Sequence, residues 1–308
     1  MDLRHNQLPW SDQIWAKINA DLAQALAQSR RVRAPFEVFH VPSSTQSVMA
    51  DARDPGAVDA ASSYMFSETE TQPIIELWAP FEVLQSQVQN EGDGFFALDR
   101  VIEAAHEIGF AEDMLLMYGG DVLTKRIGLK VIKNTQSLPP SAQISSVRTL
   151  WDGIQDYAYQ SSSDNVYVNR GYGGDRSAGL ELFNAVVDAR QMLRSVRRYE
   201  PYALFLSSNL EGALQSTVPG SNSLNTPIER MRPLVTAGIH TTPVLPNDSA
   251  VVVSVARAWV DIAQAMEPSV QFLRIGPNGR YEMRLVERFA FRLKDRSARC
   301  AIYLNPNS

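Results

Sequence analysis

The hydrophobic pattern at the start of the chain is that of an amphipathic helix. From residue 11 to residue 28, apolar side chains recur every three or four positions, after a Pro-Trp-Ser-Asp start that supplies an N-cap. The apolar positions are Ile14, Trp15, Ile18, Leu22, Ala25 and Leu26. Pro35 follows, and residues 36–41 have the pattern of an extended segment. The sequence therefore predicts a first helix that leads into a short strand.

Longer helices are predicted in two further places. Between residues 93 and 118 apolar positions mark one helical face, and Gly119-Gly120 ends the helix. At 1.5 Å per residue this helix spans about 36 Å, long enough to support sheets in a mixed domain. The second long helix is predicted over residues 177–198, and a capping box at 226–229 marks the start of another helix.

Strand patterns lie between and after these helices. Short apolar runs predict strands at 74–81, 126–133, 202–206, 251–255 and 270–275. A Pro277-Asn278-Gly279 turn then leads into a long last strand with an apolar face and a charged face. The apolar face holds Met283, Leu285, Phe289, Phe291 and Leu293, and the charged face holds Glu282, Arg284, Arg288, Arg292 and Lys294. Strands and helices do not alternate regularly and no internal repeat is visible, so the predicted class is α+β.

Residues 42–72 do not fit this pattern of packed elements. They are rich in Ser, Thr, Ala, Asp and Gly, and thirty such residues are unusual as a loop inside a compact domain. The segment is either a disordered loop or a long two-stranded arm that finds its partners on a neighbouring molecule. Five apolar side chains favour the arm and are the predicted assembly contacts: Val48, Met49, Tyr64, Met65 and Phe66.

Composition narrows the function classes. The 308 residues are 44% hydrophobic and 20% charged, so the chain has material for a core and is not expected to be disordered. The formal charge of −5 argues against a free-standing nucleic-acid binder. Arginine outnumbers lysine by 24 to 5, which hints at subunit contacts because guanidinium groups pair well at partly buried interfaces.

Metal, disulfide and membrane roles have little support. Cys300 is the single cysteine, and the four histidines are scattered singly, so neither a disulfide nor a metal site is expected. The start of the chain lacks an apolar run of signal-peptide length. The longest apolar stretch, 250–255, is far too short to span a bilayer, and a cytoplasmic location is expected.

No catalytic constellation emerges either. The glycines at 171–174 lack the lysine of a phosphate-binding loop, and residues 220–223 do not have the form of a nucleophile elbow. Glu112 and Asp113 are adjacent on the long helix and project about 100° apart, so a salt-bridged helix face is favoured over a catalytic pair. We expect no enzyme activity and no cofactor.

A basic stripe lies on the helix predicted over 177–198. Its four members share one side of that helix: Arg190, Arg194, Arg197 and Arg198. Two roles are open for these arginines. They can pair with acids of the same or a neighbouring subunit, or they can face the phosphates of enclosed DNA. The pairing is favoured because no aromatic residues are interleaved with the stripe.

The order of these features resembles that of the Hong Kong 97-type shell proteins, which include encapsulins and the major capsid proteins of tailed phages. The first helix with Arg30-Arg31 is similar to the encapsulin amino-terminal helix. Further similar motifs follow in the same order as in that group. They lie at 73–77 with Pro80-Phe81, 111–113 with Tyr118-Gly119, 201–204, 237–239 with Pro243, and 287–292. Two stretches depart from the encapsulin pattern, 256–258 and 264–266, and Ser86 stands near the position of a flavin-stacking tryptophan, so flavin is not expected.

The resemblance implies a division of the chain. It consists of an amino-terminal arm and helix (1–41), an extended loop (42–72), a peripheral domain (73–135 and 263–308) and an axial domain (136–262). The long helix becomes the spine helix of the peripheral domain. A polar loop in the axial domain would lie at a symmetry axis and contribute Gln215, Asn222 and Asn225.

The resemblance also implies the function and leaves its kind open. The first expectation is the major capsid protein of a tailed bacteriophage or prophage, which encloses double-stranded DNA in a virion assembled in a bacterial cytoplasm. The alternative is an encapsulin shell in the bacterial cytoplasm, with a protein cargo held through a short terminal peptide in the groove beside the first helix. In both, copies of the chain are expected to associate with one another in pentamers, with or without hexamers, and no membrane is involved. An unrelated α+β enzyme is the third possibility.

Overall fold

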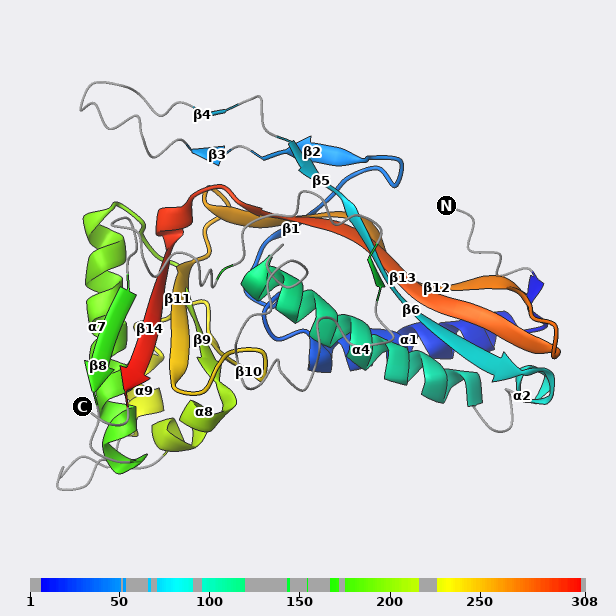
Figure 1. The fold of residues 1–308 in the computed structure, drawn as a ribbon, viewed down its shortest axis with the longest axis horizontal. Helices are drawn as coiled ribbons and strands as arrows, with labels where there is room; N and C mark the ends of the chain where they lie inside the picture. Colours follow the sequence, from blue (N-terminus) through cyan, green and yellow to red (C-terminus); the bar gives the residue numbers. More distant parts are fainter. Residues whose placement is uncertain are drawn as a thin grey trace.

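Two five-stranded sheets and the helices packed on them make up most of the described part of the molecule. The structure is a computed structural model. It describes residues 7–50, 52–53, 66–67, 71–90, 96–119, 143–144, 154, 167–171, 175–215 and 226–305. Figure 1 shows a compact region around one sheet at one end and a long, narrow second sheet that extends away from it. The predicted α+β class is confirmed.

The narrow sheet, here called the long sheet, is built around one strand of 14 residues, β13. Its strand order is β1-β12-β13-β6-β7. The bounds are β1 Val38–His40, β6 Ile75–Leu84, β7 Gln143–Ile144, β12 Val260–Ile275 and β13 Arg280–Leu293. β13 is antiparallel to both β12 and β6, whereas β1 is parallel to β12. A strand of this length spans about 45 Å, which gives the sheet its elongated form.

β12 is longer than the sequence predicts. The pattern indicated a strand only at 270–275, whereas β12 begins at Val260. The pairing between β12 and β13 shifts register between Met266 and Ser269, on either side of Pro268. Proline lacks the N–H that a strand ladder needs and is tolerated at such irregularities, so it hid the first half of the strand.

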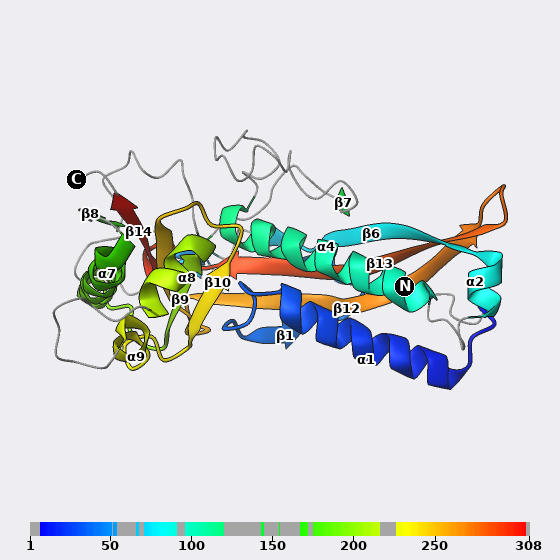
Figure 2. The ribbon, with the colours of Figure 1, turned by 90° about the horizontal axis from the view of Figure 1, so that it is seen from below.

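Two helices cover one face of the long sheet. They are α1 (Asp12–Ser29) and α4 (Phe96–Tyr118), which run side by side on the near side of the sheet in Figure 2. Ser11 caps α1, because its side-chain oxygen accepts a hydrogen bond from the Ile14 amide at 3.4 Å. α4 is buried on all sides over its second half, which includes Met114, Leu115 and Leu116. Both predicted helices are confirmed, and α4 forms the centre of the larger core.

The second sheet, here called the compact sheet, has the order β10-β9-β11-β14-β8. The bounds are β8 Tyr167–Gly171, β9 Tyr202–Ser207, β10 Ile239–Thr242, β11 Ser249–Ser254 and β14 Arg299–Asn305. Every residue of β9 is buried, because Tyr202, Leu204 and Leu206 face one core and Ala203 and Phe205 face the other. A strand that is covered on both faces has a continuous apolar sequence, and such a run predicted the strand at 202–206.

Helices cover the outer face of the compact sheet. They are α7 (Asp175–Ser195), α8 (Ser208–Gln215) and α9 (Pro227–Met231). α7 matches the second predicted long helix, and α9 begins at the predicted capping box, where the Thr226 amide donates to the Glu229 carboxylate at 3.0 Å. A short helix, α2 (Gln85–Gln89), follows β6 at the far end of the long sheet. None of the helices in the described ranges has both the length and the apolar character needed to cross a bilayer.

The carboxyl-terminal strand corrects one expected boundary. Residues 263–308 were expected to belong to the same domain as 73–135, which contributes β6 and α4. Instead β14 pairs with β11 and β8 in the compact sheet. Cys300, Ile302 and Leu304 pack into the core beneath α7, so burial of this apolar face returns the chain to the compact sheet. The strand predicted over 126–133 lies outside the described residues.

The segment 42–72 has two-stranded character where the structure describes it. β2 (Ser47–Met49) pairs antiparallel with β5 (Thr71–Pro73), and β3 (Ala52–Arg53) pairs antiparallel with β4 (Phe66–Ser67). In Figure 1 these pairs extend away from the face of the long sheet opposite to α1 and α4. The two-stranded alternative that the sequence left open therefore agrees with the described part of this arm.

The crossing of α1 and α4 depends on one glycine. A Cβ atom added at Gly109 would lie 2.1 Å from the Ser29 hydroxyl oxygen and 2.6 Å from the Ser29 Cβ. Ser29 lies in the last turn of α1, and its hydroxyl also approaches the Ala105 carbonyl at 3.4 Å. The two helices approach this closely because residue 109 has no side chain.

We expect Gly109→Ala to lower the free energy of unfolding by roughly 1–3 kcal/mol, since the added methyl group forces α1 away from α4. Gly212→Ala is the matched control, because a Cβ at that exposed position in α8 meets nothing within 4 Å. It should raise stability by about 0.5–1 kcal/mol through the higher helix propensity of alanine. Urea unfolding of the two variants measures both values, and equal effects would contradict the close-crossing explanation.

Candidate functional site

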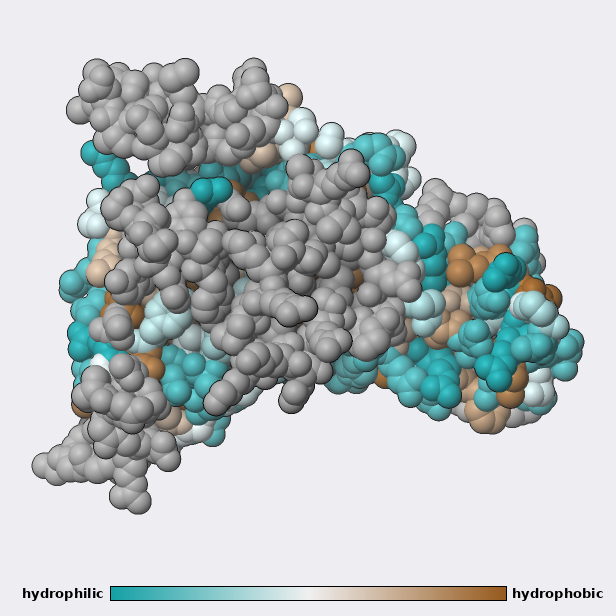
Figure 3. Space-filling model, viewed as in Figure 1, coloured by the Kyte–Doolittle hydropathy of each residue, from teal (hydrophilic) through white to brown (hydrophobic). Residues whose placement is uncertain are grey.

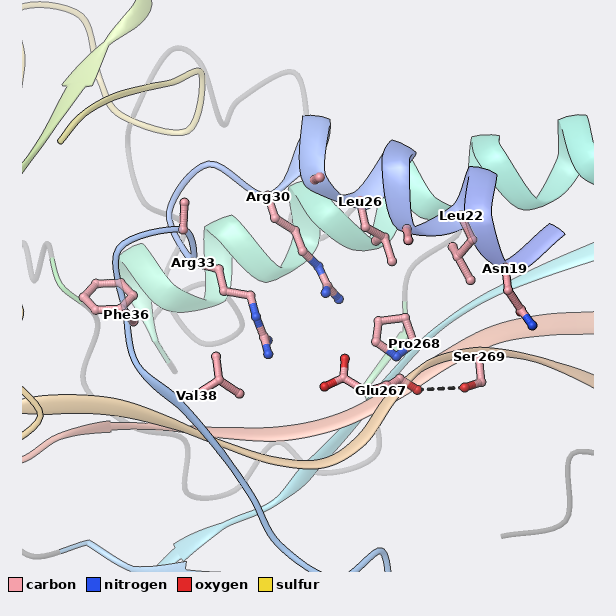
Figure 4. A pocket seen from close by; sticks show the side chains of 13 residues that line it. Asn19, Leu22, Leu26, Arg30, Arg33, Phe36, Val38, Glu267, Pro268 and Ser269 are labelled. Atoms are coloured by element: carbon pink, nitrogen blue, oxygen red, sulfur yellow. Dashed lines mark hydrogen bonds between the residues drawn. The ribbon is translucent and has the colours of Figure 1, made fainter. Parts of the chain in front are cut away.

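A groove of about 780 Å³ lies between α1 and the long sheet. One wall is α1, which contributes Asn19, Leu22, Ala23, Leu26 and Ala27. The segment after the helix contributes Arg30, Arg33, Ala34 and Phe36, and the opposite wall is formed by Val38, Glu267, Pro268 and Ser269. Figure 4 shows Arg30 and Arg33 extending from the α1 side toward the strands of the long sheet. The lining of the groove is therefore mainly apolar, with the charged side chains of Arg30 and Arg33 at one end.

The irregular part of β12 forms the wall opposite to α1. β1 ends at His40, which pairs with Gln264, so residues 267–269 of β12 extend beyond the edge that β1 covers. The Ser269 hydroxyl donates to the Glu267 carbonyl at 2.9 Å across Pro268. The Glu267 side chain is 57% exposed, and its carboxylate lies 3.6 Å from His40 Nδ1. Beside Val38 and Pro268, this wall thus presents one exposed carboxylate to the groove.

Buried ion pairs hold the floor of the groove. Arg30 pairs with Glu112 of α4 at 2.5 Å and also with Glu287 of β13. Arg33 donates to Glu112 at 2.6 Å and to the Gln264 side-chain oxygen at 2.6 Å. Both glutamates are fully buried. Removing one partner from a buried ion pair leaves the other charge uncompensated, which is strongly destabilising. The network therefore ties the segment after α1 to α4 and to both central strands.

Asp113 holds the same segment through its backbone. One carboxylate oxygen accepts the Val32 amide at 2.9 Å, and the other accepts the Arg31 amide at 3.1 Å. Glu112 and Asp113 thus have different partners, as their angular separation on α4 requires. The salt bridges predicted for this helix face are present at Glu112, in a fully buried position.

Burial changes the proton affinity of two of these groups. It raises the pKa of Asp113 to about 8, against the opposing effect of the two backbone amides. Burial also raises the pKa of Glu287 to about 7, with Arg30 opposing the shift. One oxygen of Glu287 has no hydrogen-bond partner in the described part of the chain, which is consistent with a carboxyl group that binds a proton near neutral pH.

The root of the extended loop lies on the opposite face of β13. Val48 is half-buried and Met49 is 56% exposed, so the two predicted contacts that the structure describes leave apolar surface available. Tyr64 and Met65 lie outside the described residues. Phe66 belongs to β4, where only the backbone is described. Their assembly role stays a prediction.

The basic stripe is paired within the subunit, but only Arg190 and Arg194 lie on α7, because the helix ends at Ser195 and Arg197 has a left-handed backbone conformation. Arg190 and Arg194 both bind Glu200, with the Arg194 contact at 2.8 Å. These contacts hold the pKa of Glu200 below its usual range. Arg198 pairs with Asp295 and stacks 4.2 Å above the Trp259 ring, while Arg197 is exposed at the end of the helix. Three of the four arginines therefore have acidic partners of the same chain.

The predicted symmetry-axis loop is described only at its start. Gln215 is the exposed last residue of α8. Asn222 and Asn225 lie outside the described residues. Their place at a symmetry axis stays a prediction.

Several residues of the site were missed by sequence reasoning. Glu287 interrupts the apolar positions of the last predicted strand, between Leu285 and Phe289, and this interruption was the available signal. The sequence pattern gave Arg30 a place after the first helix but no role at a site, and it did not single out Arg33. Within the described ranges, no three His, Cys, Asp or Glu side chains lie together in a way that could hold a metal ion.

Exposed apolar surface also occurs at the free end of the long sheet. Leu84, at the end of β6, is 45% exposed, and Ile275, at the end of β12, is 56% exposed. Figure 3 shows hydrophobic surface at this end of the molecule, beyond the region that grey atoms cover.

Known proteins share these features to different degrees. Residues 169–290 match the family described as "Encapsulating protein for peroxidase". The type 1 encapsulin shell protein EncA of Myxococcus xanthus (strain DK1622) is 23% identical over 304 residues, which cover 97% of this chain and 96% of that protein. The virus-like particle from Pyrococcus furiosus has a similar fold, with a TM-score of 0.66, 14% identity and coverage of 94% and 98%. The capsid of Myoviridae phage XM1 gives a TM-score of 0.55 at 14% identity, with coverage of 88% and 90%.

The long sheet, the buried helix α4 and the projecting arm thus define a class of protein. Together these elements make up the Hong Kong 97-type fold, which tailed-phage major capsid proteins and encapsulins share. Within that class, the matched family and the curated relative are both of the encapsulating kind.

The raised pKa values predict how stability depends on pH. A carboxyl group whose pKa is higher in the folded chain than in the unfolded chain stabilises the fold while it is protonated. For Glu287 and Asp113 this stabilisation is complete below about pH 4 and is lost as the pH rises to about 8. We expect the melting temperature to fall over this range. Glu287 accounts for on the order of 3 kcal/mol of the change.

Glu287→Gln should make the pH dependence shallower, because the amide cannot titrate. Glu282→Gln is the control, since that carboxylate lies on the same strand, is partly exposed and pairs with Arg274 at 2.7 Å. Scanning calorimetry at steps between about pH 5 and pH 8 measures the slope. A slope in Glu287→Gln as steep as in Glu282→Gln would show that Glu287 does not titrate in the folded protein.

Proposed function

We propose that the chain is the subunit of a self-assembling, closed protein shell of the encapsulating kind, and that the shell encloses a protein. The groove beside α1 receives a short segment of the enclosed protein. The subunit assembles in pentamers, with or without hexamers, in a bacterial cytoplasm. Contacts between subunits include the apolar residues of the extended loop, namely Val48, Met49, Tyr64, Met65 and Phe66. This order of candidates reverses the one expected from the sequence.

The full-length similarity to a shell protein is the observation that carries the proposal. The alignment with the M. xanthus protein covers 97% of this chain, so the likeness includes α1 and the extended loop as well as the two sheets. The matched family description names an enclosed peroxidase, and that description belongs to the family. For this chain it supports a protein as the enclosed partner.

The groove supports the same conclusion from its chemistry. Leu22, Leu26 and Phe36 line it, and apolar surface of this kind binds apolar side chains of a peptide segment. The donors of the arginines at its floor are held by Glu112, Glu287 and Gln264, so they are not free to bind a phosphate backbone. A groove with these properties suits a peptide better than a nucleic acid.

The second candidate is a tailed-phage major capsid protein that encloses double-stranded DNA. The likeness in fold to the capsid of phage XM1 favours it. Its weakness is electrostatic, because the formal charge is −5 and three arginines of the basic stripe already pair with Glu200 or Asp295. Few cations remain to neutralise DNA phosphates on that surface.

Purification of the protein from its native cell tests both candidates. We expect particles of uniform diameter by negative-stain electron microscopy, with a second protein in stoichiometric amounts and no nuclease-protected DNA. Protected duplex DNA in place of a protein would support the phage candidate and contradict the proposal. A monomeric elution volume would contradict both.

A substitution in the groove tests its role separately from assembly. Ala27→Glu places a carboxylate among the apolar lining residues, where an enclosed segment would bury it at a cost of several kcal/mol. We expect particles of normal diameter whose content of the second protein falls at least tenfold. Densitometry of the purified particles gives the ratio of the two proteins.

Gln28→Glu is the matched control, because it adds a carboxylate at the adjacent exposed position of α1, which does not line the groove. It should leave the content unchanged. If the Ala27→Glu particles keep their full content, the groove does not hold the enclosed protein.

A further inference from the structure

The loop face of β13 carries arginines at regular spacing. Arg284, Arg288 and Arg292 are four residues apart, so they lie on the same face of the strand, opposite to the apolar side chains that contact α4. The sequence predicted this charged face but assigned it no role. Two of the three arginines contact the root of the extended loop.

Arg288 binds the first turn of the loop. One guanidinium nitrogen donates to the Ser43 carbonyl, and the other donates to the Thr45 carbonyl at 3.1 Å. The second nitrogen also lies 3.5 Å from the Gln46 side-chain oxygen. Ser43 and Thr45 precede β2, so their carbonyls lie outside its ladder with β5, and a fixed arginine acts as their donor.

Arg292 binds the loop six residues beyond Ser43. Two of its nitrogens hold the buried Asp261 carboxylate at 2.7 and 2.6 Å. The third donates to the Met49 carbonyl at 2.9 Å. The Asp261 carboxylate and the Phe39 ring, which lies 4.6 Å below the guanidinium, fix the direction of that third donor. The position of the Met49 carbonyl is therefore fixed relative to the long sheet.

The returning strand completes the root. The Ile74 amide donates to the Gln46 carbonyl at 2.8 Å, and β5 pairs with β2. The loop is thus attached at its base to the start of β6 through backbone and to β13 through two arginines. Side-chain donors, and not strand pairing with the long sheet, decide the angle at which the loop leaves the subunit.

We propose that Arg288 and Arg292 are positioning residues for assembly. They set the angle of the extended loop against the long sheet and, through it, the angle between neighbouring subunits. This inference rests on the proposed shell function. A closed shell requires one repeated angle between subunits, and a small change at the root of a long arm becomes a large displacement at its end.

Arg288→Gln tests the inference, with Arg284→Gln as its matched control. Both variants remove one arginine from the same face of β13. Arg284 bonds within the sheet, to Gln271 at 2.7 Å and to Glu76 at 2.9 Å, and not to the loop root. Circular dichroism and melting temperature establish that each subunit is folded, and electron microscopy gives the distribution of particle diameters.

We expect Arg288→Gln to reduce the fraction of particles with the wild-type diameter at least threefold, and Arg284→Gln to retain it. Arg288→Lys serves if the glutamine variant does not fold. A lysine ammonium lacks the fork that reaches two carbonyls at once, so a broadened distribution is expected there too. Distributions equal to wild type in the folded Arg288 variants would overturn the inference. A wild-type chain that remains monomeric would remove the proposed function and the inference with it.

Discussion

The alternation of side chains along β13 is the constraint on which the other features depend. β12 and β6 pair with both edges of this strand, so its side chains can point only to the two faces of the long sheet. Leu285, Glu287 and Phe289 face α4, and Arg288 faces the loop root. A slip of one residue would place Arg288 in the core and Phe289 beneath the loop, so the pairing register is strongly fixed. The groove floor and the loop root are therefore set by the same register.

Charge burial then explains why the segment after α1 is held so firmly. A buried glutamate is costly without a partner, and Glu112 and Glu287 lie on different elements that both need a cation. Arg30 reaches both, and this brings the end of α1 to α4 and β13 together. Such a network adds little net stability compared with an apolar core, but it specifies which segment can occupy the site. The groove lies between this fixed point and the irregular part of β12.

Much of the fold could be predicted from the sequence, because its local signals agree with its packing. α1, α4 and α7 have helical periodicity with clear ends, and β13 has strict alternation. The first half of β12 was missed because Pro268 interrupts the pattern. The place of β14 was missed because a sheet assignment depends on long-range pairing that one sequence does not display.

The candidate site was harder to predict for a related physical reason. Arg30, Glu112 and Glu287 are distant in sequence, and the residues beside Glu112 do not distinguish a buried carboxylate from a solvated one. The odd placement of Glu287 on an apolar face was the one local sign. The contacts of Arg288 and Arg292 with backbone carbonyls leave no sign in the sequence, since any loop residue provides a carbonyl.

A cryo-electron microscopy reconstruction of the wild-type particle, at a resolution that shows side chains, tests the central claim most directly. The claim is that one strand holds the groove on one face and the intersubunit loop on the other. The account predicts a closed shell in which Arg288 and Arg292 bind the carbonyls of Ser43, Thr45 and Met49, while the rest of the loop lies over a neighbouring subunit. A shell whose loop has left these arginines, or folds back on its own subunit, would contradict it.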